Sequence, residues 1–226
     1  MTLLRSSHIP LEWSIDDMKT ETAQLVSFLH ELKLRSERIE RAAAVHLNTV
    51  QIGNQVWAQE NLKVVYFRNG DPVPLVEMSN AWIKLKTPAY CVAENGDYLY
   101  NGYAVFDPRG LAPRGYHVAS EVEWQVLVDE VNKTFDPKAL KSVSAMERFS
   151  IFKKLATANF SVEMTYRRCG EFGGFWPAFR EAHWWTSTRL YTALPVQCWV
   201  NEMEEKLFSG LKQIRNGLVV RCVKDA

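Results

Sequence analysis

The sequence predicts an α+β fold, in which short antiparallel strands and long loops accompany a few helices. One amphipathic helix is indicated over residues 120–131, where apolar side chains recur at helical spacing. A hairpin of two short strands is indicated over residues 49–57. A longer helical pattern over residues 15–43 precedes this hairpin. We therefore expect a helical N-terminal extension over residues 1–46 and one α+β domain over residues 47–226.

The N-terminal helix is predicted by apolar residues that recur at alternating steps of three and four. This seam consists of Ile15, Met18, Thr22, Leu25, Leu29 and Leu32, and it continues more weakly through Ser36, Ile39 and Ala43. Such a seam is typical of helices that associate with one another. Two interpretations stay open, because the helix either joins copies of the chain or packs on its own domain or on a neighbouring protein. We expect residues 15–43 to make an oligomer or assembly contact.

The first strands of the domain are predicted from turn chemistry. Gly53 and Asn54 form a two-residue turn that makes residues 49–57 a β-hairpin. A turn is also indicated over residues 69–72, which read Asn-Gly-Asp-Pro. Residues 73–98 have little regular period and predict irregular loops. The side chains expected to hold these loops in place are Trp82, Tyr90 and Cys91.

The best-defined helix begins at Ser120. A short extended piece precedes it, and Glu123 stands three residues after Ser120, so the two residues can cap each other's backbone donors. One apolar stripe follows, which is made of Trp124, Leu127, Val128 and Val131. We expect this stripe, and Trp124 in particular, to face the core.

The rest of the chain predicts a second short helix and then the closing strands. Ser144 and Glu147 form another capping-box candidate, followed by the apolar residues Met146, Phe149, Phe152 and Leu155. Residues 170–179 form a loop rich in glycine and aromatic residues. The closing strands are expected at residues 184–188, 197–200 and 218–223. Asn216 and Gly217 predict the last turn between strands.

Five segments in order carry a family resemblance, and they are residues 52–62, 81–91, 99–124, 183–188 and 217–225. The third ends in R-G-Y-H-V-A-S-E-V-E-W, and Thr165-Tyr166-Arg167 stands where the relatives carry Gly-Tyr-Arg. The chain resembles the Fibrobacter succinogenes major paralogous domain, a branch of the C-type-lectin-like fold that is distantly related to formylglycine-generating proteins. Tyr116 and Ala119 replace the usual Trp and Pro of the G-W-x-x-P-T-x-x-E-W element.

The resemblance implies a C-type-lectin-like domain with short antiparallel sheets, two main helices and long loops. It covers most of the chain in five ordered segments, which is more specific than any single motif. It also implies that five tryptophans belong to the core, namely Trp57, Trp82, Trp124, Trp184 and Trp185.

Composition and charge disfavour several classes of function. The chain has 27 basic and 26 acidic residues and a net charge of +1, so it lacks the basic character of nucleic-acid-binding proteins. No segment is long and apolar enough to span a bilayer, and the N-terminus carries no export signal. The relatives are commonly exported or displayed on a surface. We expect the chain to stay inside the cell, to travel outward in an assembled particle, or to have lost a signal segment.

Patterns for catalysis and metal binding are weak. The sequence lacks the G-x-S-x-G, phosphate-loop and H-E-x-x-H motifs. The four cysteines form no C-x-x-C pair, and we expect reduced, buried thiols at Cys91, Cys169, Cys198 and Cys222. Oxidase chemistry of the formylglycine-generating type needs two nearby thiols, and only Cys198 and Cys222 lie in the C-terminal region. His117 and His183 are expected to bond to the backbone. We expect no enzyme, cofactor or metal, although calcium near residues 201–205 stays open.

The implied role is recognition of a glycan or a protein surface, at the surface of a cell or particle. Two alternatives are kept: an assembly protein that joins a complex through its N-terminal helix, and an oxidase-like enzyme by analogy of fold. The candidate ligand-binding residues can stack, donate and accept, and they are Arg189, Tyr191, Trp199, Glu202 and Trp176. For Trp199, core packing is an open alternative. Residues 189–216 lack the Asn, Ser and Tyr bias of diversified lectin-like segments, so we expect a fixed partner.

Overall fold

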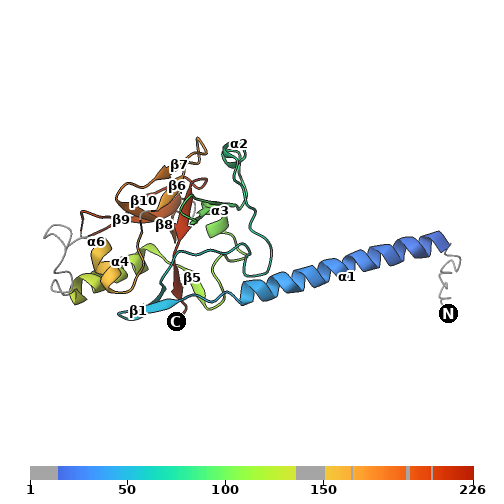
Figure 1. Ribbon diagram of the computed structural model, residues 1–226, viewed down its shortest axis with the longest axis horizontal. Coiled ribbons are helices and arrows are strands. Elements are labelled where there is room, and N and C mark those ends of the chain that lie inside the picture. Colours follow the sequence, from blue (N-terminus) through green and yellow to red (C-terminus); the bar gives the residue numbers. More distant parts are fainter. Residues whose placement is uncertain (1–14, 136–150, 164, 192–193, 205) are drawn as a thin grey trace, which may run out of the picture.

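The computed structural model describes residues 15–135, 151–163, 165–191, 194–204 and 206–226. A long helix, α1 (Ile15–Ala43), extends from a body that contains the described strands (Figure 1). Two sheets, one antiparallel and one mixed, form this body together with several shorter helices. The predicted α+β class is confirmed.

The first sheet joins the two ends of the body. Its four strands follow the order β1 (Thr49–Ile52), β2 (Gln55–Ala58), β12 (Cys222–Lys224) and β5 (Tyr116–Val118). Ile52 pairs with Gln55, which leaves Gly53 and Asn54 as the predicted two-residue turn. Gly53 has a φ of +57°, a conformation that glycine adopts without strain. Strand β12 pairs with both β2 and β5, so the last strand holds the first hairpin in place.

The second sheet is larger and carries the candidate site. Its main path runs β10 (Leu207–Leu211), β9 (Leu194–Asn201), β8 (Glu181–Leu190), β11 (Gly217–Val220), β4 (Tyr98–Asn101) and β3 (Tyr90–Val92). Two more strands branch from it, because β6 (Tyr166–Arg168) pairs with β11 and with β7 (Phe175–Pro177). Strands β8 and β11 are parallel, and the other pairs are antiparallel.

Helix α4 (Glu121–Thr134) is built as predicted. The Ser120 hydroxyl accepts a hydrogen bond from the Glu123 amide, and the Glu123 carboxylate accepts one from the Ser120 amide, which completes a capping box. The apolar stripe is buried at Trp124, Leu127, Val128 and Val131. Short helices lie at α2 (Ser79–Trp82), α3 (Gly102–Val105) and α6 (Ile151–Thr157).

The predicted tryptophan core is confirmed. All five residues, Trp57, Trp82, Trp124, Trp184 and Trp185, are fully buried. The Trp124 ring lies at the centre of one cluster, with its centroid 4.9 Å from that of Trp57 and 4.5 Å from that of Trp184. Tilted and offset ring pairs at such distances add stability beyond the burial of apolar area. Helix α4 is therefore fixed to the sheets through this cluster.

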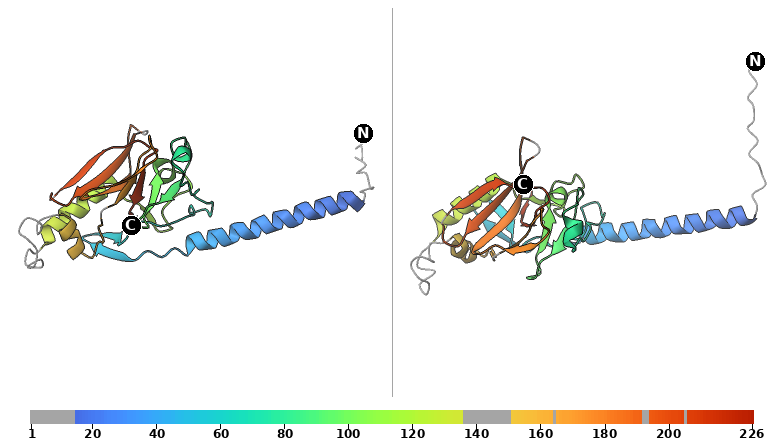
Figure 2. Two further views of the ribbon diagram at one scale, coloured as in Figure 1. Left: turned by 45° about the horizontal axis from the view of Figure 1, so that its top comes forward. Right: turned by 90° about the horizontal axis from the view of Figure 1, so that it is seen from above.

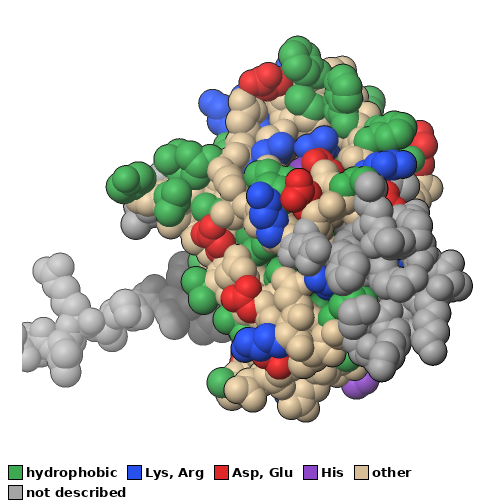
Figure 3. Space-filling view, turned by 90° about the vertical axis from the view of Figure 1, so that its left-hand side faces the viewer, with side chains coloured by type: hydrophobic (Ala, Val, Ile, Leu, Met, Phe, Trp, Pro, Cys, Tyr) green, Lys and Arg blue, Asp and Glu red, His purple; other side chains and the backbone are tan. Residues whose placement is uncertain are grey.

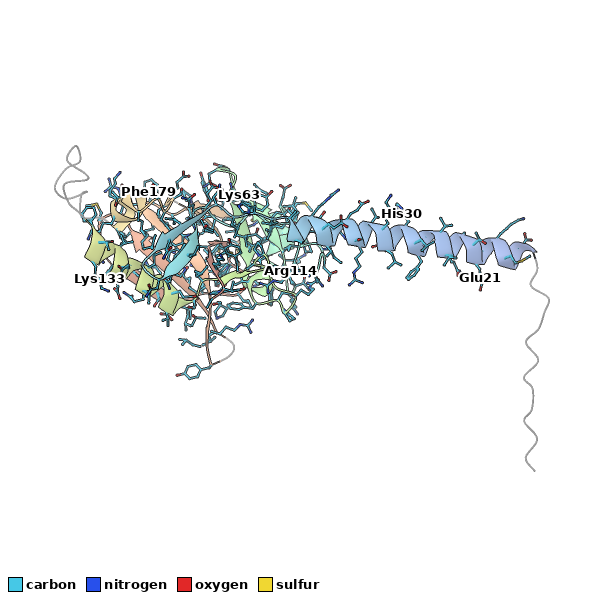
Figure 4. The ribbon with its side chains drawn as sticks, turned by 90° about the horizontal axis from the view of Figure 1, so that it is seen from below. Glu21, His30, Lys63, Arg114, Lys133 and Phe179 are labelled. Carbon is cyan, nitrogen blue, oxygen red and sulfur yellow. The ribbon has the colours of Figure 1, made fainter. Side chains whose placement is uncertain are left out.

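Helix α1 projects from the body with its seam uncovered. The side chains of Met18, Leu25, Leu29 and Leu32 are between 46% and 58% exposed. Both views in Figure 2 show the helix pointing away from the sheets, and Figure 4 places Glu21 and His30 on the part that lies clear of the body. None of the described helices combines the length and apolar character that a bilayer crossing requires. The seam of α1 does not pack against the described part of its own domain.

Only the C-terminal end of α1 contacts the body. Ala42 is buried there, and a Cβ atom on Gly70 would lie 2.6 Å from Cγ1 of Ile39. Gly70 has a φ of +85° and belongs to the predicted turn over residues 69–72. Glycine is thus needed both for the turn and for the close approach of the helix.

One predicted turn is wrong, and the predicted start of one helix lies outside the described residues. Asn216 and Gly217 do not form a hairpin turn, because Gly217 already begins β11 and Asn216 closes a turn with Gln213. The Asn216 side chain accepts a hydrogen bond from Gly170 instead of supporting a two-residue loop. The predicted capping residues Ser144 and Glu147, together with Met146 and Phe149, lie outside the described residues. The helix predicted in that region is described as α6, which contains Leu155.

Candidate functional site

The loop between β6 and β7 fixes one wall of the site. Its ends are closed by hydrogen bonds from Cys169 to Gly174 and from Gly173 to Cys169, each 2.9 Å long. Gly173 has a φ of +68°, and a Cβ atom there would lie 2.7 Å from Cα of Ser79. The Ser79 hydroxyl donates to the Gly173 carbonyl at 2.9 Å. The glycine-rich sequence therefore lets this loop pack directly on α2.

Arg168 anchors β6 beneath the loop. Its guanidinium is fully buried, donates to the carbonyls of Gly173 and Val76, and lies 4.5 Å from the centroid of the Trp82 ring. Backbone carbonyls thus satisfy a charge that would be costly to bury unpaired. Arg168 is a structural residue, and it holds its neighbour Arg167 at the surface of the strand.

A cavity of about 210 Å³ opens beside this strand pair, and we call it the aromatic-basic pocket. Its lining residues are Arg167, Arg168, Cys169, Trp176, Lys212 and Asn216. Arg167 faces Trp176 in the pairing of β6 with β7, and the Trp176 side chain is 59% exposed. Figure 3 shows one face of the body, with hydrophobic side chains at the top and several Lys and Arg side chains below them.

The two outer cations of the aromatic-basic pocket are not neutralised. Within the part of the chain that the structure describes, neither the Arg167 guanidinium nor the Lys212 ammonium has a hydrogen-bond or ion-pair partner. Both side chains are half-buried. Burial lowers the pKa of Lys212, and the positive charge of Arg167 lowers it further. The charges of Cys169 and Glu181 raise the pKa, but by less. Two cations that lose water without gaining a partner form a site that favours an anion.

A stack of three aromatic rings lies next to these cations. The Trp199 ring lies between the His183 and Phe208 rings, with centroid distances of 5.7 Å and 5.4 Å and nearly parallel planes. His183 Nε2 lies 2.8 Å from the Glu181 carboxylate. The prediction that His183 bonds through its ring to the backbone is wrong, because a carboxylate takes that place.

His183 is a neutral member of this stack at neutral pH. Burial lowers the pKa of His183 to about 4, the hydrogen bond to Glu181 opposes this shift, and the charges of Arg167 and Lys212 reinforce it. The carboxylate of Glu181 is engaged by His183 and also accepts from Asn201 at 3.5 Å. Among the described residues, it forms an ion pair with neither Arg167 nor Lys212.

The five predicted binding residues do not form one site. Trp176 lines the aromatic-basic pocket, and Trp199 lies one step away, beside His183. Glu202 pairs with Arg180 at 3.6 Å, at the turn between β9 and β10. Arg189 and Tyr191 lie at the far end of β8, roughly 30 Å along the strand from Glu181.

The far end of β8 has a different character from the aromatic-basic pocket. The Arg189 guanidinium lies 3.9 Å from the centroid of the Phe106 ring and donates to the Phe106 carbonyl at 3.2 Å. Tyr191 is 88% exposed. Arg189 is thus held against the body, whereas Tyr191 projects from it.

Arg167 and Lys212 were not identified from the sequence. Arg167 lies on β6, Lys212 directly follows β10, and the two residues belong to no motif with fixed spacing. The one available signal was the segment Thr165-Tyr166-Arg167, which stands where the relatives carry Gly-Tyr-Arg. That signal marks Arg167. Lys212 is brought near Arg167 only by the order of the strands in the sheet, which runs from β10 through β9, β8 and β11 to β6.

His117 and the cysteines also depart in part from expectation. His117 bonds through both ring nitrogens to carboxylates, with Glu123 at 2.7 Å and Asp225 at 2.8 Å, and not to the backbone as predicted. Cys91, Cys198 and Cys222 are buried as predicted, whereas Cys169 is half-exposed. Among the described residues, which omit Glu205, no three His, Cys, Asp or Glu side chains converge to hold a metal.

The comparisons agree with the resemblance in the sequence. The family model for the Fibrobacter succinogenes major domain matches residues 50–224. No curated protein and no solved structure matches the chain. Two of the resembling segments meet in the body, where buried Arg221 donates to the Asn61 side chain at 2.9 Å. Asn61 also accepts from the Trp184 indole at 2.9 Å, so a third segment joins them. The chain belongs to the Fibrobacter succinogenes major domain family.

Proposed function

We propose that this protein is a non-enzymatic recognition domain that binds a glycan or a protein surface through the aromatic-basic pocket. The carrying observation is the pair of half-buried cations, Arg167 and Lys212, which have no partner among the described residues. Partial burial of an unpaired cation costs stability. Such a cost is expected where the cation serves a ligand.

Exposed aromatic side chains beside the pocket support this proposal. Phe172 and Trp176 are 73% and 59% exposed, and they belong to the loop before β7 and to β7 itself. Clustered, exposed apolar side chains commonly mark binding surfaces. Tryptophan is especially frequent among the residues that dominate binding energy.

The arrangement of the body supports a C-type-lectin-like fold as part of the same proposal. The first hairpin and the last strand pair in one sheet, so both ends of the domain are held together. The loops at the aromatic-basic pocket are then displayed from a fixed core. Binding residues are often carried by loops on a rigid scaffold.

An oxidase-like activity is the weaker candidate. Cys198 and Cys222 belong to two different buried clusters of the core. Burial raises the pKa of each thiol to about 12, which leaves little thiolate for nucleophilic attack or metal binding at neutral pH. We therefore favour recognition over thiol chemistry.

The proposal is tested with an array of the glycans and surface proteins that the protein meets in its native setting. Trp176→Ala and Arg167→Gln should each lower binding by about tenfold or more, as expected for central contacts. Phe179→Ala is the matched control, because this exposed aromatic side chain belongs to the same loop but does not line the pocket. Full binding by both pocket variants, with unchanged melting, would move the site elsewhere.

A second candidate role, assembly through α1, is favoured by the uncovered seam. Val26 and Phe28 flank the seam and are also exposed, which widens the apolar face. In a parallel bundle, Arg35 of one copy would lie near Glu40 of the next, so the flanking charges are complementary. We infer that copies of this chain associate through α1 and carry several recognition domains. The native mass of the protein tests this inference.

A further inference from the structure

We propose that the aromatic-basic pocket binds the carboxylate of an acidic sugar, such as a uronic or sialic acid residue of a glycan. This proposal rests on the proposed function and names the ligand class for that site. The sugar ring would lie against Trp176, and its carboxylate would be held by Arg167 and Lys212.

The charges of the cavity select an anion. Arg167 and Lys212 both line it, and none of the described lining residues is acidic. The charge of Glu181 acts on both His183 and Lys212, and this carboxylate is already bonded to His183. Hydrogen bonds from cations to a carboxylate are about twice as strong as bonds between neutral groups. The pocket therefore distinguishes an acid from its neutral analogue.

The donors of the cavity select an acceptor-rich ligand. Asn216 is more than nine-tenths buried, and its side-chain oxygen accepts from the Gly170 amide at 2.8 Å. This bond fixes the orientation of the amide, so Nδ2 remains as a donor, and no described residue accepts from it. Together with Arg167 and Lys212, the pocket offers three kinds of donor. Sugar carboxylates and hydroxyls supply matching acceptors.

The size and shape of the cavity favour one sugar ring. The volume of about 210 Å³ is smaller than the roughly 300–1,000 Å³ of pockets that enclose a drug-sized ligand. The exposed Trp176 indole offers a flat apolar face beside the cations. An extended acidic peptide would place alternate side chains in successive pockets. A single hollow with one aromatic wall fits a ring with one charged group better.

The test is a titration of the full chain with small sugars. The tryptophan indoles carry nitrogen-15, and NMR monitors their signals during the titration. The Trp176 signal is identified as the one that Trp176→Phe removes. Methyl glucuronoside and N-acetylneuraminic acid are the acidic probes, and methyl glucuronamide is the neutral analogue of the first. We expect the Trp176 signal to shift with the acids. The amide should bind about tenfold more weakly than the acid, which corresponds to one lost charge-assisted hydrogen bond.

Variants assign the carboxylate contacts. Arg167→Gln and Lys212→Gln should each weaken binding of methyl glucuronoside by about tenfold. Arg167→Lys keeps the charge and should retain part of the affinity, which separates a lost contact from a damaged fold. Lys133→Gln is the matched control, because this exposed cation lies on α4, away from the pocket. Unchanged indole signals from the buried tryptophans confirm that each variant is folded.

The outcomes separate this inference from the proposed function. Equal shifts of the Trp176 signal with the acid and the amide, at equal affinity, would overturn the acidic class and leave the recognition site in place. Tighter binding of a tetraglutamate peptide than of either acid would overturn the sugar class. No shift of Trp176 with any probe would overturn the inference. Retained binding of native glycans or proteins by Trp176→Ala and Arg167→Gln would overturn the proposed function itself.

Discussion

Helices α1 and α4 carry the same kind of apolar stripe, but only the stripe of α4 is buried within the chain. Trp124 and Leu127 of α4 are fully buried, whereas Leu25 and Leu29 of α1 are more than half exposed. Apolar periodicity thus predicts a helix with a contact face, and it leaves open where the contact lies. For α4 the partner is the core of its own domain. For α1 the described part of the chain supplies no such contact.

This difference also concerns stability. An isolated helix in water gains little from propensity alone, and most helical stability in proteins comes from packing of an apolar face. Helix α4 has both its capping box and its buried stripe. Most of α1 has only its own backbone and a few exposed pairs, such as Arg38 with Glu31 at 3.0 Å. We therefore expect α1 to depend on association for a stable helix.

The largest effect should separate the two stripes. Trp124→Ala should lower the free energy of unfolding by about 3–5 kcal/mol, because it removes the central ring of a packed cluster. Leu29→Ala in α1 should change the unfolding of the body by less than about 0.5 kcal/mol, as exposed positions do. Denaturant unfolding followed by tryptophan fluorescence measures both. Similar losses for the two variants would mean that α1 packs on the body.

A smaller effect concerns the helix caps. Ser120→Ala should destabilise the body by about 1 kcal/mol, because it removes the acceptor for the Glu123 amide. Thr22→Ala is the control in α1, where the hydroxyl only donates to the Met18 carbonyl of the same exposed helix. The control should leave the unfolding of the body unchanged. If Ser120→Ala has no effect, the capping box does not contribute to the stability of α4.

The smallest effect should depend on pH and act through His117. Burial alone would lower the pKa of His117, but hydrogen bonds to Asp225 and Glu123 outweigh it and raise the pKa above its ordinary value. The protonated ring therefore stabilises the fold at low pH, and this contribution is lost as the pH rises from about 6.5 through the raised pKa. A half-exposed ion pair contributes only about 0–1 kcal/mol.

Thermal melting at pH 6 and pH 8 tests this link between α4 and the C-terminus. The native protein should lose more stability between these two values than His117→Gln, which cannot be protonated. Equal losses in both proteins would show that His117 does not stabilise the fold through its charge.

The parts of the fold that could be predicted from the sequence are those set by local chemistry. Ser120 with Glu123 defines the start of α4, and Gly53 with Asn54 defines the first hairpin. The short strand β6 escaped prediction because it pairs with β11 through one contact that is distant in sequence, between Arg168 and Gly217, and with β7 across a glycine-rich loop that was not identified as a hairpin. Local turn chemistry was misleading at Asn216, whose side chain bonds to Gly170.

The candidate site was predictable only at its aromatic wall. Trp176 was identified because it lies in a glycine-rich loop, and it does line the aromatic-basic pocket. Arg167 and Lys212 were missed because the pocket is made by strand pairing and not by a motif. Arg189 and Glu202 were grouped by sequence interval, but the length of the β8–β9 hairpin places them at opposite ends.

The most direct test of the contrast between the two helices is the native mass of the full chain by sedimentation equilibrium. We expect the mass of the native protein to be a multiple of 26.0 kDa, the mass of one chain. Leu25→Gln combined with Leu29→Gln should reduce the mass to that of one chain, while the body keeps its melting temperature. A single-chain mass of 26.0 kDa for the native protein at all concentrations would contradict association through α1.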